Sequence, residues 1–203
     1  ADALSDWTAV REMAAAGIVR SFHLPVRLRF EGQFRTRDAL APNVVARLPG
    51  RDPRFAGTAV VVSAHYDHLG RGPEVAGDTI YNGVVDNALG VAGVLETARV
   101  LMAGGTPPRR SVIFLFSTAE EHGLLGSQYF LDHPPLPVGR MAANVNVDGL
   151  AFNAAFADLI GVGGELSSLG PTLERVAEGL GLALAQPPEG FLDSEPFARP
   201  PPP

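Results

Sequence analysis

The sequence contains no cysteine, no lysine and no apolar run long enough to cross a bilayer. Without cysteine the chain has no thiol nucleophile, no disulfide and no cysteine-ligated zinc site, so any bound metal must use His, Asp or Glu ligands. A transmembrane helix needs roughly 20 apolar residues, and we therefore expect no membrane span. The formal net charge of −6 at pH 7 argues against a phosphate-binding surface, so nucleic acid is not an expected partner.

The composition is that of a globular protein with one sizeable core: 203 residues, of which 46% are hydrophobic and 19% charged. We expect a single domain over residues 1–203, with a lead-in helix and strand at 1–42 and an irregular, proline-rich tail at 187–203. The amino end lacks the charged and strongly apolar regions of a secretory signal, which is typical of a mature or recombinant end.

Short runs rich in Val, Ile and Phe alternate with helical patterns along the chain. The runs at 58–65 and 111–117 are continuously apolar, as strands buried on both faces are. Strands that alternate with helices indicate an α/β sandwich with a mostly parallel sheet. The expected strands are 26–34, 43–50, 58–65, 111–117, 144–148 and 157–163. The expected helices are 5–20, 87–103, 120–131 and 166–182.

Candidate functional residues gather where these strands end, which is where open α/β sheets build their sites. The strand at 58–65 runs into SAHYDHLG, with His65 and Asp67 at its exit. A metal-bound imidazole needs an acceptor on its second nitrogen to fix its tautomer, and Asp67 can provide one. The alternative is a loop histidine beside a surface aspartate.

Two further aspartates, Asp86 and Asp148, stand in comparable positions. Asp148 closes the segment NVNVD, and Asp86 precedes a helix at the end of the Gly- and Asn-rich stretch GDTIYNGVVD. Asp86 has two interpretations. It can bind a metal while Asn87 begins the helix, or it can simply cap the helix by accepting its free N–H groups.

Adjacent carboxylates, Glu120 and Glu121, follow the strand at 111–117 in the segment STAEEHGLLGS. They can be an anionic first turn at the positive end of a helix. Alternatively, one glutamate binds a metal while its neighbour acts as the general base on a metal-bound water.

Together these residues indicate a metal centre. Hard carboxylates with one imidazole per metal favour zinc, with manganese or cobalt as alternatives. Asp86, Glu121 and Asp148 carry three negative charges, and a bridging hydroxide adds a fourth. Two divalent cations about 3.5–4 Å apart would balance these charges and polarise a carbonyl group.

The segments SAHYDHLG, GDTIYNGVVDNALG, FLFSTAEEHGLLGS and NVNVDGL occur in an order and spacing that resembles the co-catalytic zinc aminopeptidase family. This family includes bacterial leucine-type aminopeptidases, carboxypeptidase-like proteins and glutaminyl cyclases. The resemblance covers roughly Asn43 to Phe197. It implies a zinc-exopeptidase-like fold, a three-layer α/β/α sandwich around a mixed sheet, together with peptide substrates and two zinc ions.

Carried over position by position, the resemblance implies four metal ligands: His65, Asp86, Glu121 and Asp148. Within this set Asp86 would bridge both ions. His65 and Asp148 would belong to one ion, and Glu121 to the other. Outside the set, Glu120 would be the general base and Asp67 would orient His65.

The remaining histidines are interpreted as non-ligands: His23, His68, His122 and His133. Of these, His68 is read as a loop residue. In the family the last zinc ligand is a histidine beyond a Pro-Phe-Ala segment like the one at 196–198, and the printed sequence ends before that point. The second ion would then have no imidazole, so we interpret the sequence as an incomplete record of a longer enzyme.

The resemblance therefore implies a zinc-dependent aminopeptidase that hydrolyses the amino-terminal residues of peptides through a metal-bound hydroxide. It also implies a secreted or periplasmic location. Two alternatives remain open at this point. One is a glutaminyl-cyclase-like transferase, and the other is a degenerate, non-catalytic member of the fold that acts as a binding module.

Overall fold

The computed structural model describes residues 7–17, 27, 29–33, 38–150 and 155–185. The chain divides into two compact units, Ala1–Ala39 and Leu40–Pro203. In the first unit the described regular element is helix α1 (Trp7–Ala15). The helix expected at 5–20 also includes residues 5–6 and 18–20, which lie outside the described residues. All the strands described below belong to the second unit.

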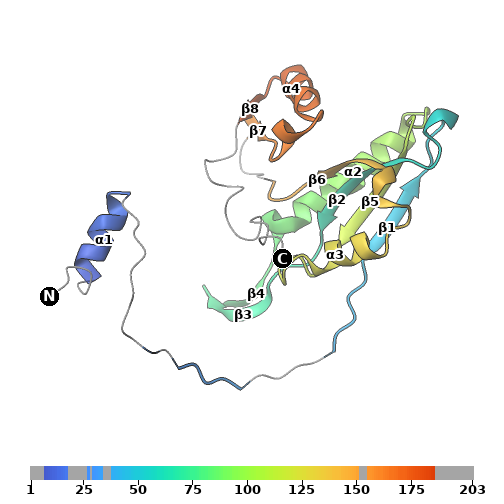
Figure 1. The fold of residues 1–203 in the computed structure, drawn as a ribbon. Coiled ribbons are helices and arrows are strands. Elements are labelled where there is room, and N and C mark those ends of the chain that lie inside the picture. The colour runs from blue at the N-terminus through green and yellow to red at the C-terminus, as the bar shows by residue number, and fades with distance from the viewer. Residues whose placement is uncertain (1–6, 18–26, 28, 34–37, 151–154, 186–203) are drawn as a thin grey trace. The chain divides into compact units, whose positions relative to one another are not determined.

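The centre of the second unit is a four-stranded mixed sheet in the order β1-β5-β2-β6 (Figure 1). Its strands are β1 (Val44–Leu48), β2 (Ala59–His65), β5 (Ser111–Ser117) and β6 (Met141–Asn146). Strand β2 pairs in parallel with both β5 and β6, whereas β1 pairs antiparallel with β5. The carboxyl ends of β2, β5 and β6 therefore meet at one edge, and the mostly parallel mixed sheet is confirmed.

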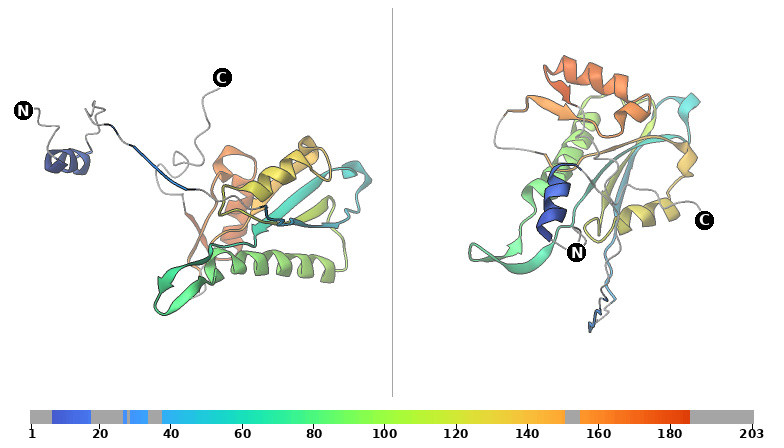
Figure 2. Two further views of the ribbon diagram at one scale, coloured as in Figure 1. Left: turned by 90° about the horizontal axis from the view of Figure 1, so that it is seen from below. Right: turned by 60° about the vertical axis from the view of Figure 1, so that its left-hand side comes forward.

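Helices cover both faces of this sheet, which gives three layers (Figure 2). Helix α2 (Leu89–Ala103) lies on one face and helix α3 (Leu125–Asp132) on the other. Because successive side chains of a strand point to opposite faces, alternate residues of β2 and β5 enter two separate cores. The core under α3 contains Ala59, Val61, Ile113, Leu115 and Phe130. The core under α2 contains Ala64, Val94, Val112 and Phe114.

Smaller elements surround or follow the sheet in the chain. Strands β3 (Gly70–Val75) and β4 (Asp78–Tyr81) form an antiparallel hairpin between β2 and α2. Strands β7 (Asp158–Ile160) and β8 (Ala183–Ala185) pair in parallel, and α4 (Gly170–Gly179) contacts β8. Single-turn helices occupy Pro53–Phe55, Val138–Arg140 and Gly164–Leu166. Among the described residues, none of the helices combines the length and the apolar character needed to cross a membrane.

The strand expected at 26–34 is not formed, since its described residues, 27 and 29–33, adopt no regular structure. Apolar and polar residues alternate there, but no strand pairs with them within the described residues, and Phe30 is 88% exposed. Alternation predicts a strand only where a second strand completes the backbone hydrogen bonds.

Helix α3 begins at Leu125 rather than at Glu120 as the sequence pattern predicts. Positive φ angles occur just before this segment, at Ala119 (51°), and within it, at Gly123 (91°) and Leu124 (62°). A right-handed helix excludes this left-handed backbone conformation. The pair of glutamates therefore lies in a turn that precedes the helix.

Asn43 fixes the position of this turn. Its Nδ2 donates to the carbonyl oxygen of Gly126 (2.7 Å), and its Oδ1 accepts from the backbone N–H of Thr118 (3.1 Å). One amide side chain thus ties the end of β5 to the start of α3. The intervening backbone, which carries the glutamates, is held at both of its ends.

Ile113 is 1% exposed and belongs to the core under α3, whereas Ile80 in the β3–β4 hairpin is 47% exposed. We expect Ile113→Ala to lower the free energy of unfolding by about 2–5 kcal/mol, because the substitution leaves a cavity between packed layers. The matched change Ile80→Ala should cost less than about 1 kcal/mol. Urea denaturation of both variants tests this, and equal losses would contradict the described core.

Candidate metal centre

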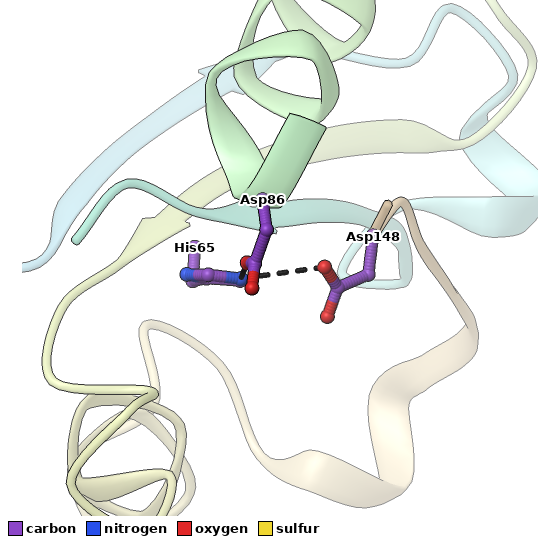
Figure 3. A group of neighbouring side chains, drawn as sticks. All are labelled: His65, Asp86 and Asp148. Carbon is purple, nitrogen blue, oxygen red and sulfur yellow. Dashed lines mark hydrogen bonds and ion pairs between the residues drawn. The ribbon is translucent and has the colours of Figure 1, made fainter. Parts of the chain in front are cut away.

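The candidate centre lies at the sheet edge where β2, β5 and β6 end. His65 is the last residue of β2, and Asp148 follows β6 by two residues. Asp86 comes from an irregular helical segment (Val84–Ala88) just before α2. Figure 3 shows the carboxylates of Asp86 and Asp148 pointing toward the imidazole ring of His65.

His65 is only 2% exposed, and both of its ring nitrogens have partners. Its Nδ1 lies 3.0 Å from the main-chain carbonyl oxygen of Asp67. Because a carbonyl can only accept, Nδ1 carries a hydrogen, and Nε2 is the nitrogen available to a metal. Nε2 lies 3.0 Å from Oδ1 of Asp86 and 3.3 Å from Oδ1 of Asp148. In the metal-free chain a second proton on Nε2 satisfies these contacts, and a cation would replace it.

The electrostatic environment of His65 favours this positive charge. Burial by itself lowers the pKa of His65, but the negative charges of Asp148 and Glu120 outweigh burial, and the pKa of His65 is raised above its ordinary value. The ring therefore lies in a negative field that attracts cations. Protons and metal ions compete for Nε2 in this field.

Asp86 is free to face the ring because its neighbour Asn87 performs the helix-capping role. The buried Asn87 side chain accepts from the backbone N–H of Gly90 (3.1 Å) and donates to the carbonyl oxygen of Val147 (2.9 Å). The peptide bond between Asp86 and Asn87 is cis. Of the two interpretations of Asp86, the structure thus shows Asn87 and not Asp86 bonded to the first turn of α2.

Asp67 holds the glutamate turn as well as His65. Its Oδ1 accepts from the backbone N–H of Glu120 (3.1 Å) and its Oδ2 from that of Glu121 (3.4 Å). The same carboxylate stays 3.7 Å from Nδ1 of His65, so the hydrogen bond that orients the ring comes from the Asp67 carbonyl. The main-chain carbonyl of Asp67, rather than its side chain, therefore orients the ring of His65. The Asp67 carboxylate instead holds the backbone of Glu120 and Glu121.

A second acidic group lies beside the first and includes a histidine that sequence reasoning set aside. Nδ1 of His68 lies 2.7 Å from Oε1 of Glu121 and 3.8 Å from Oδ2 of Asp86. The candidate ligand atoms of these three residues all lie within 4.8 Å of one another, as do those of His65, Asp86 and Asp148. Asp86 is common to both groups.

Glu120 belongs to neither group of candidate ligands. Burial raises the pKa of its carboxyl; the charge of His65 opposes this, while the neighbouring carboxylates, Asp148 first among them, raise it further. The net result is a pKa above the ordinary value for glutamate. The two adjacent glutamates therefore differ in their surroundings, since Glu121 lies in a candidate ligand group and Glu120 does not.

The residues fit divalent cations by charge and by donor type. Five carboxylates converge on this edge: Asp67, Asp86, Glu120, Glu121 and Asp148. Within the part of the chain that the structure describes, the arginines in ion pairs are bonded elsewhere, to Glu31, Asp52 and Glu96. Each group offers one imidazole and two carboxylates, which zinc accepts while keeping a position open. The catalytic and ligand roles of the individual residues stay predictions.

Comparison with known proteins bears out the family resemblance that the motifs indicate. The model of peptidase family M28 matches residues 43–198. A vacuolar membrane protease of Yarrowia lipolytica is 33% identical over 107 residues, which are 53% of this chain and 10% of that protein. This chain therefore corresponds to a small part of that relative.

Two solved structures share the fold. BSAP, a zinc aminopeptidase from Bacillus subtilis, is 28% identical with a TM-score of 0.54, over 71% of this chain and 34% of that one. A glutaminyl cyclase from Bacteroides thetaiotaomicron is 18% identical with a TM-score of 0.55, over 71% of this chain and 55% of that one. The likeness to the cyclase shows the fold alone.

Gly90 leaves the space that the Asn87 side chain fills. A side-chain carbon at Gly90 would lie 2.1 Å from Oδ1 of Asn87, whereas one at Gly93 in the same helix would meet its nearest neighbour at 3.7 Å. We expect Gly90→Ala to lower the free energy of unfolding by about 1–3 kcal/mol. The control Gly93→Ala should raise it by about 0.5–1 kcal/mol through helix propensity. Thermal or urea unfolding measures both, and a stabilising Gly90→Ala would contradict the described packing.

The raised pKa of His65 predicts how the stability of the chelator-treated, metal-free chain depends on pH. Protonated His65 contributes stability that is full below the unfolded-state value of 6.5 and is lost as the pH rises through the higher folded-state pKa. The free energy of unfolding should therefore fall above pH 6.5, and His65→Gln should flatten this dependence. Urea titrations over a pH series measure the slope. The exposed His133→Gln serves as the control, and an unchanged slope in His65→Gln would refute the described field.

Proposed function

The chain belongs to peptidase family M28, and on this basis we propose that it is a metal-dependent exopeptidase that removes amino-terminal residues from peptides. The observation that carries the proposal is the pair of ligand groups that share Asp86, with the Glu120 carboxyl beside them and outside both. This arrangement separates the residues that would bind cations from the residue that would move a proton.

Bound divalent cations would polarise the scissile carbonyl and make a water molecule acidic enough to attack at neutral pH. The two ligand groups consist of nitrogen and carboxylate donors that suit zinc, and BSAP is by name a zinc aminopeptidase. We therefore propose zinc as the cofactor.

Glu120 is the proposed general base. It would accept a proton from the attacking water and return it to the nitrogen of the leaving amine. Its raised pKa brings the carboxyl closer to neutral pH, which favours both halves of this transfer. The hydrogen bonds from the backbone of the glutamate pair to the Asp67 carboxylate would hold Glu120 in place while the proton moves.

The charge of the edge supports an amino-terminal rather than a carboxy-terminal specificity. A peptide amino terminus is positively charged and would be attracted by the carboxylates, whereas a peptide carboxylate would be repelled. Among the described residues, no arginine forms an ion pair with the carboxylates of this edge, so their negative charge is not reduced by such a pair. Secretion or export to the periplasm stays a prediction.

The decisive variant is Glu120→Gln, which removes the proposed base and retains the shape of the side chain. We expect the rate of hydrolysis of aminoacyl p-nitroanilides to fall by about 10²–10⁴-fold, while the metal content per chain stays unchanged. Spectrophotometric rates and elemental analysis measure the two quantities. The control Glu178→Gln changes an exposed glutamate on α4 and should retain both.

Substrate variants separate the proposal from its alternatives. Blocking the substrate amino group by acetylation should abolish cleavage, and chelation of the native chain should do the same. Loss of ammonia from an amino-terminal glutamine peptide, with no free amino acid released, would instead support a cyclase. No turnover in the zinc-loaded chain would support a binding module.

A further inference from the structure

Arginines gather at the edge of the sheet that lies opposite the candidate metal centre. At this edge the parallel strands β2, β5 and β6 begin and the antiparallel strand β1 ends (Figure 1). We call the arginines of the segments that border it the arginine edge: Arg47, Arg51, Arg54, Arg109, Arg110 and Arg140. Because the whole chain has a net charge of −6, positive charge is concentrated at one end of the sheet and negative charge at the other.

A single carboxylate compensates the arginine edge. Within the described residues the ion pairs of these arginines all go to Asp52, which contacts Arg54 (2.7 Å) and Arg109 (3.2 Å). Their other side-chain hydrogen bonds use neutral oxygens: Arg47 donates to the Ser111 hydroxyl, Arg51 to the Pro107 carbonyl and Arg110 to the Thr58 hydroxyl. One carboxylate among six guanidinium groups leaves the edge with an excess of positive charge.

An aromatic ring keeps three of these guanidinium groups together. Those of Arg110, Arg109 and Arg54 lie 4.1, 4.8 and 6.0 Å from the centre of the Phe55 ring. The quadrupole of an aromatic ring attracts cations, so Phe55 and the Asp52 carboxylate oppose the mutual repulsion of the three groups. The groups nevertheless remain accessible, since the side chain of Arg54 is 75% exposed and that of Arg109 is 55% exposed.

Main-chain contacts hold the two loops that carry most of these arginines. The N–H of Arg51 donates to the carbonyl oxygen of Pro108 (2.9 Å), and that of Asp52 to the carbonyl oxygen of Arg109 (3.2 Å). Gly50 permits this close approach, because a side-chain carbon there would lie 2.4 Å from the carbonyl carbon of Arg110. The concentration of arginines is therefore fixed by the fold of both loops.

The width of the arginine edge indicates the kind of partner. Arg47 belongs to β1 and Arg140 directly precedes β6, the two outer strands of the sheet. Neighbouring strands are about 4.8 Å apart, so the four strands span roughly 14 Å. One phosphate or carboxylate group cannot contact both sides of such an edge, whereas a surface with many anions can. Guanidinium groups bind the oxygens of phosphate in pairs.

Exposed apolar side chains flank the arginines and favour a lipid surface over an acidic protein segment. Val138, two residues before Arg140, is 46% exposed. Met102 in the last turn of α2 is 72% exposed, and the loop after this helix leads to Arg109. Basic side chains beside apolar ones suit the boundary between lipid headgroups and acyl chains. An acidic protein segment would match the charge and offer nothing comparable to Met102 and Val138.

We propose that the arginine edge binds the anionic surface of a lipid bilayer. Strand β2 runs for seven residues from this edge to His65, a distance of about 20 Å, so the bound chain would turn its candidate metal centre toward the water. The proposal is independent of the proposed function, because none of the arginines belongs to that centre. It also limits the expectation drawn from net charge, since that charge is an average over two opposite edges.

Sedimentation with lipid vesicles tests the proposal. We expect the native chain to bind phosphatidylcholine vesicles that contain phosphatidylserine, and not vesicles of phosphatidylcholine alone. The double variant Arg51→Gln/Arg140→Gln removes two exposed charges outside the Phe55 group and should weaken this binding by about 30-fold. The control Arg71→Gln/Arg175→Gln removes the same charge from the hairpin and from α4, and should weaken it by less than about threefold because salt screens distant charges.

The outcomes that would overturn the proposal are distinct. Equal binding of the native chain to both kinds of vesicle, or binding to neither, would exclude an anionic lipid surface. Equal losses in the two double variants would show an effect of total charge rather than of this edge. Binding of a poly-glutamate peptide without binding of vesicles would indicate an acidic protein partner instead. Vesicle binding should persist in the chelator-treated chain, so a failure of the proposed metal-dependent activity would leave this result intact.

Discussion

The parallel pairing of β2 with its two neighbours is the constraint on which the rest of the structure depends. In this register His65 lies opposite Ser117, and Ser63 lies opposite Asn146, so the residues that follow each strand emerge at the same edge. Their carboxylates repel one another, and left to themselves they would separate. The two apolar cores, one on each face of β2 and β5, make that separation costly because it would unpack both layers.

Neutral groups, rather than arginines, hold the acidic side chains in position. Backbone N–H groups bind the Asp67 carboxylate, and the side-chain amides of Asn43 and Asn87 tie the neighbouring turns to the sheet. Amide groups fix geometry without cancelling negative charge. The turns at this edge are therefore held in place while most of the negative charge remains, so the fold itself favours a bound cation.

Much of this arrangement could be predicted from local patterns. The apolar runs at 58–65 and 111–117 form β2 and β5. A strand that is buried on both faces is apolar at nearly every position, so it can be recognised from its own residues. The gathering of carboxylates at one sheet edge could be predicted as well, because the ends of parallel strands meet there. Other features depend on contacts between distant residues. The Asn43 amide that bounds the glutamate turn comes from the residue before β1, and the contact of His68 with Glu121 joins two loops. No periodic pattern in the sequence encodes such contacts.

The shared carboxylate of Asp86 has a consequence for how the centre would fill. Its side chain is 49% exposed and already contacts His65, but it must still lose its remaining rotational freedom when it binds a cation. The first ion to arrive would meet this entropic cost, and the second would find the carboxylate already oriented. The two binding events would then be thermodynamically linked, each favouring the other by the same factor, to the extent that this gain exceeds the repulsion between the ions. With such linkage, a limiting supply of metal would leave empty and fully loaded molecules side by side, with few half-loaded ones between them.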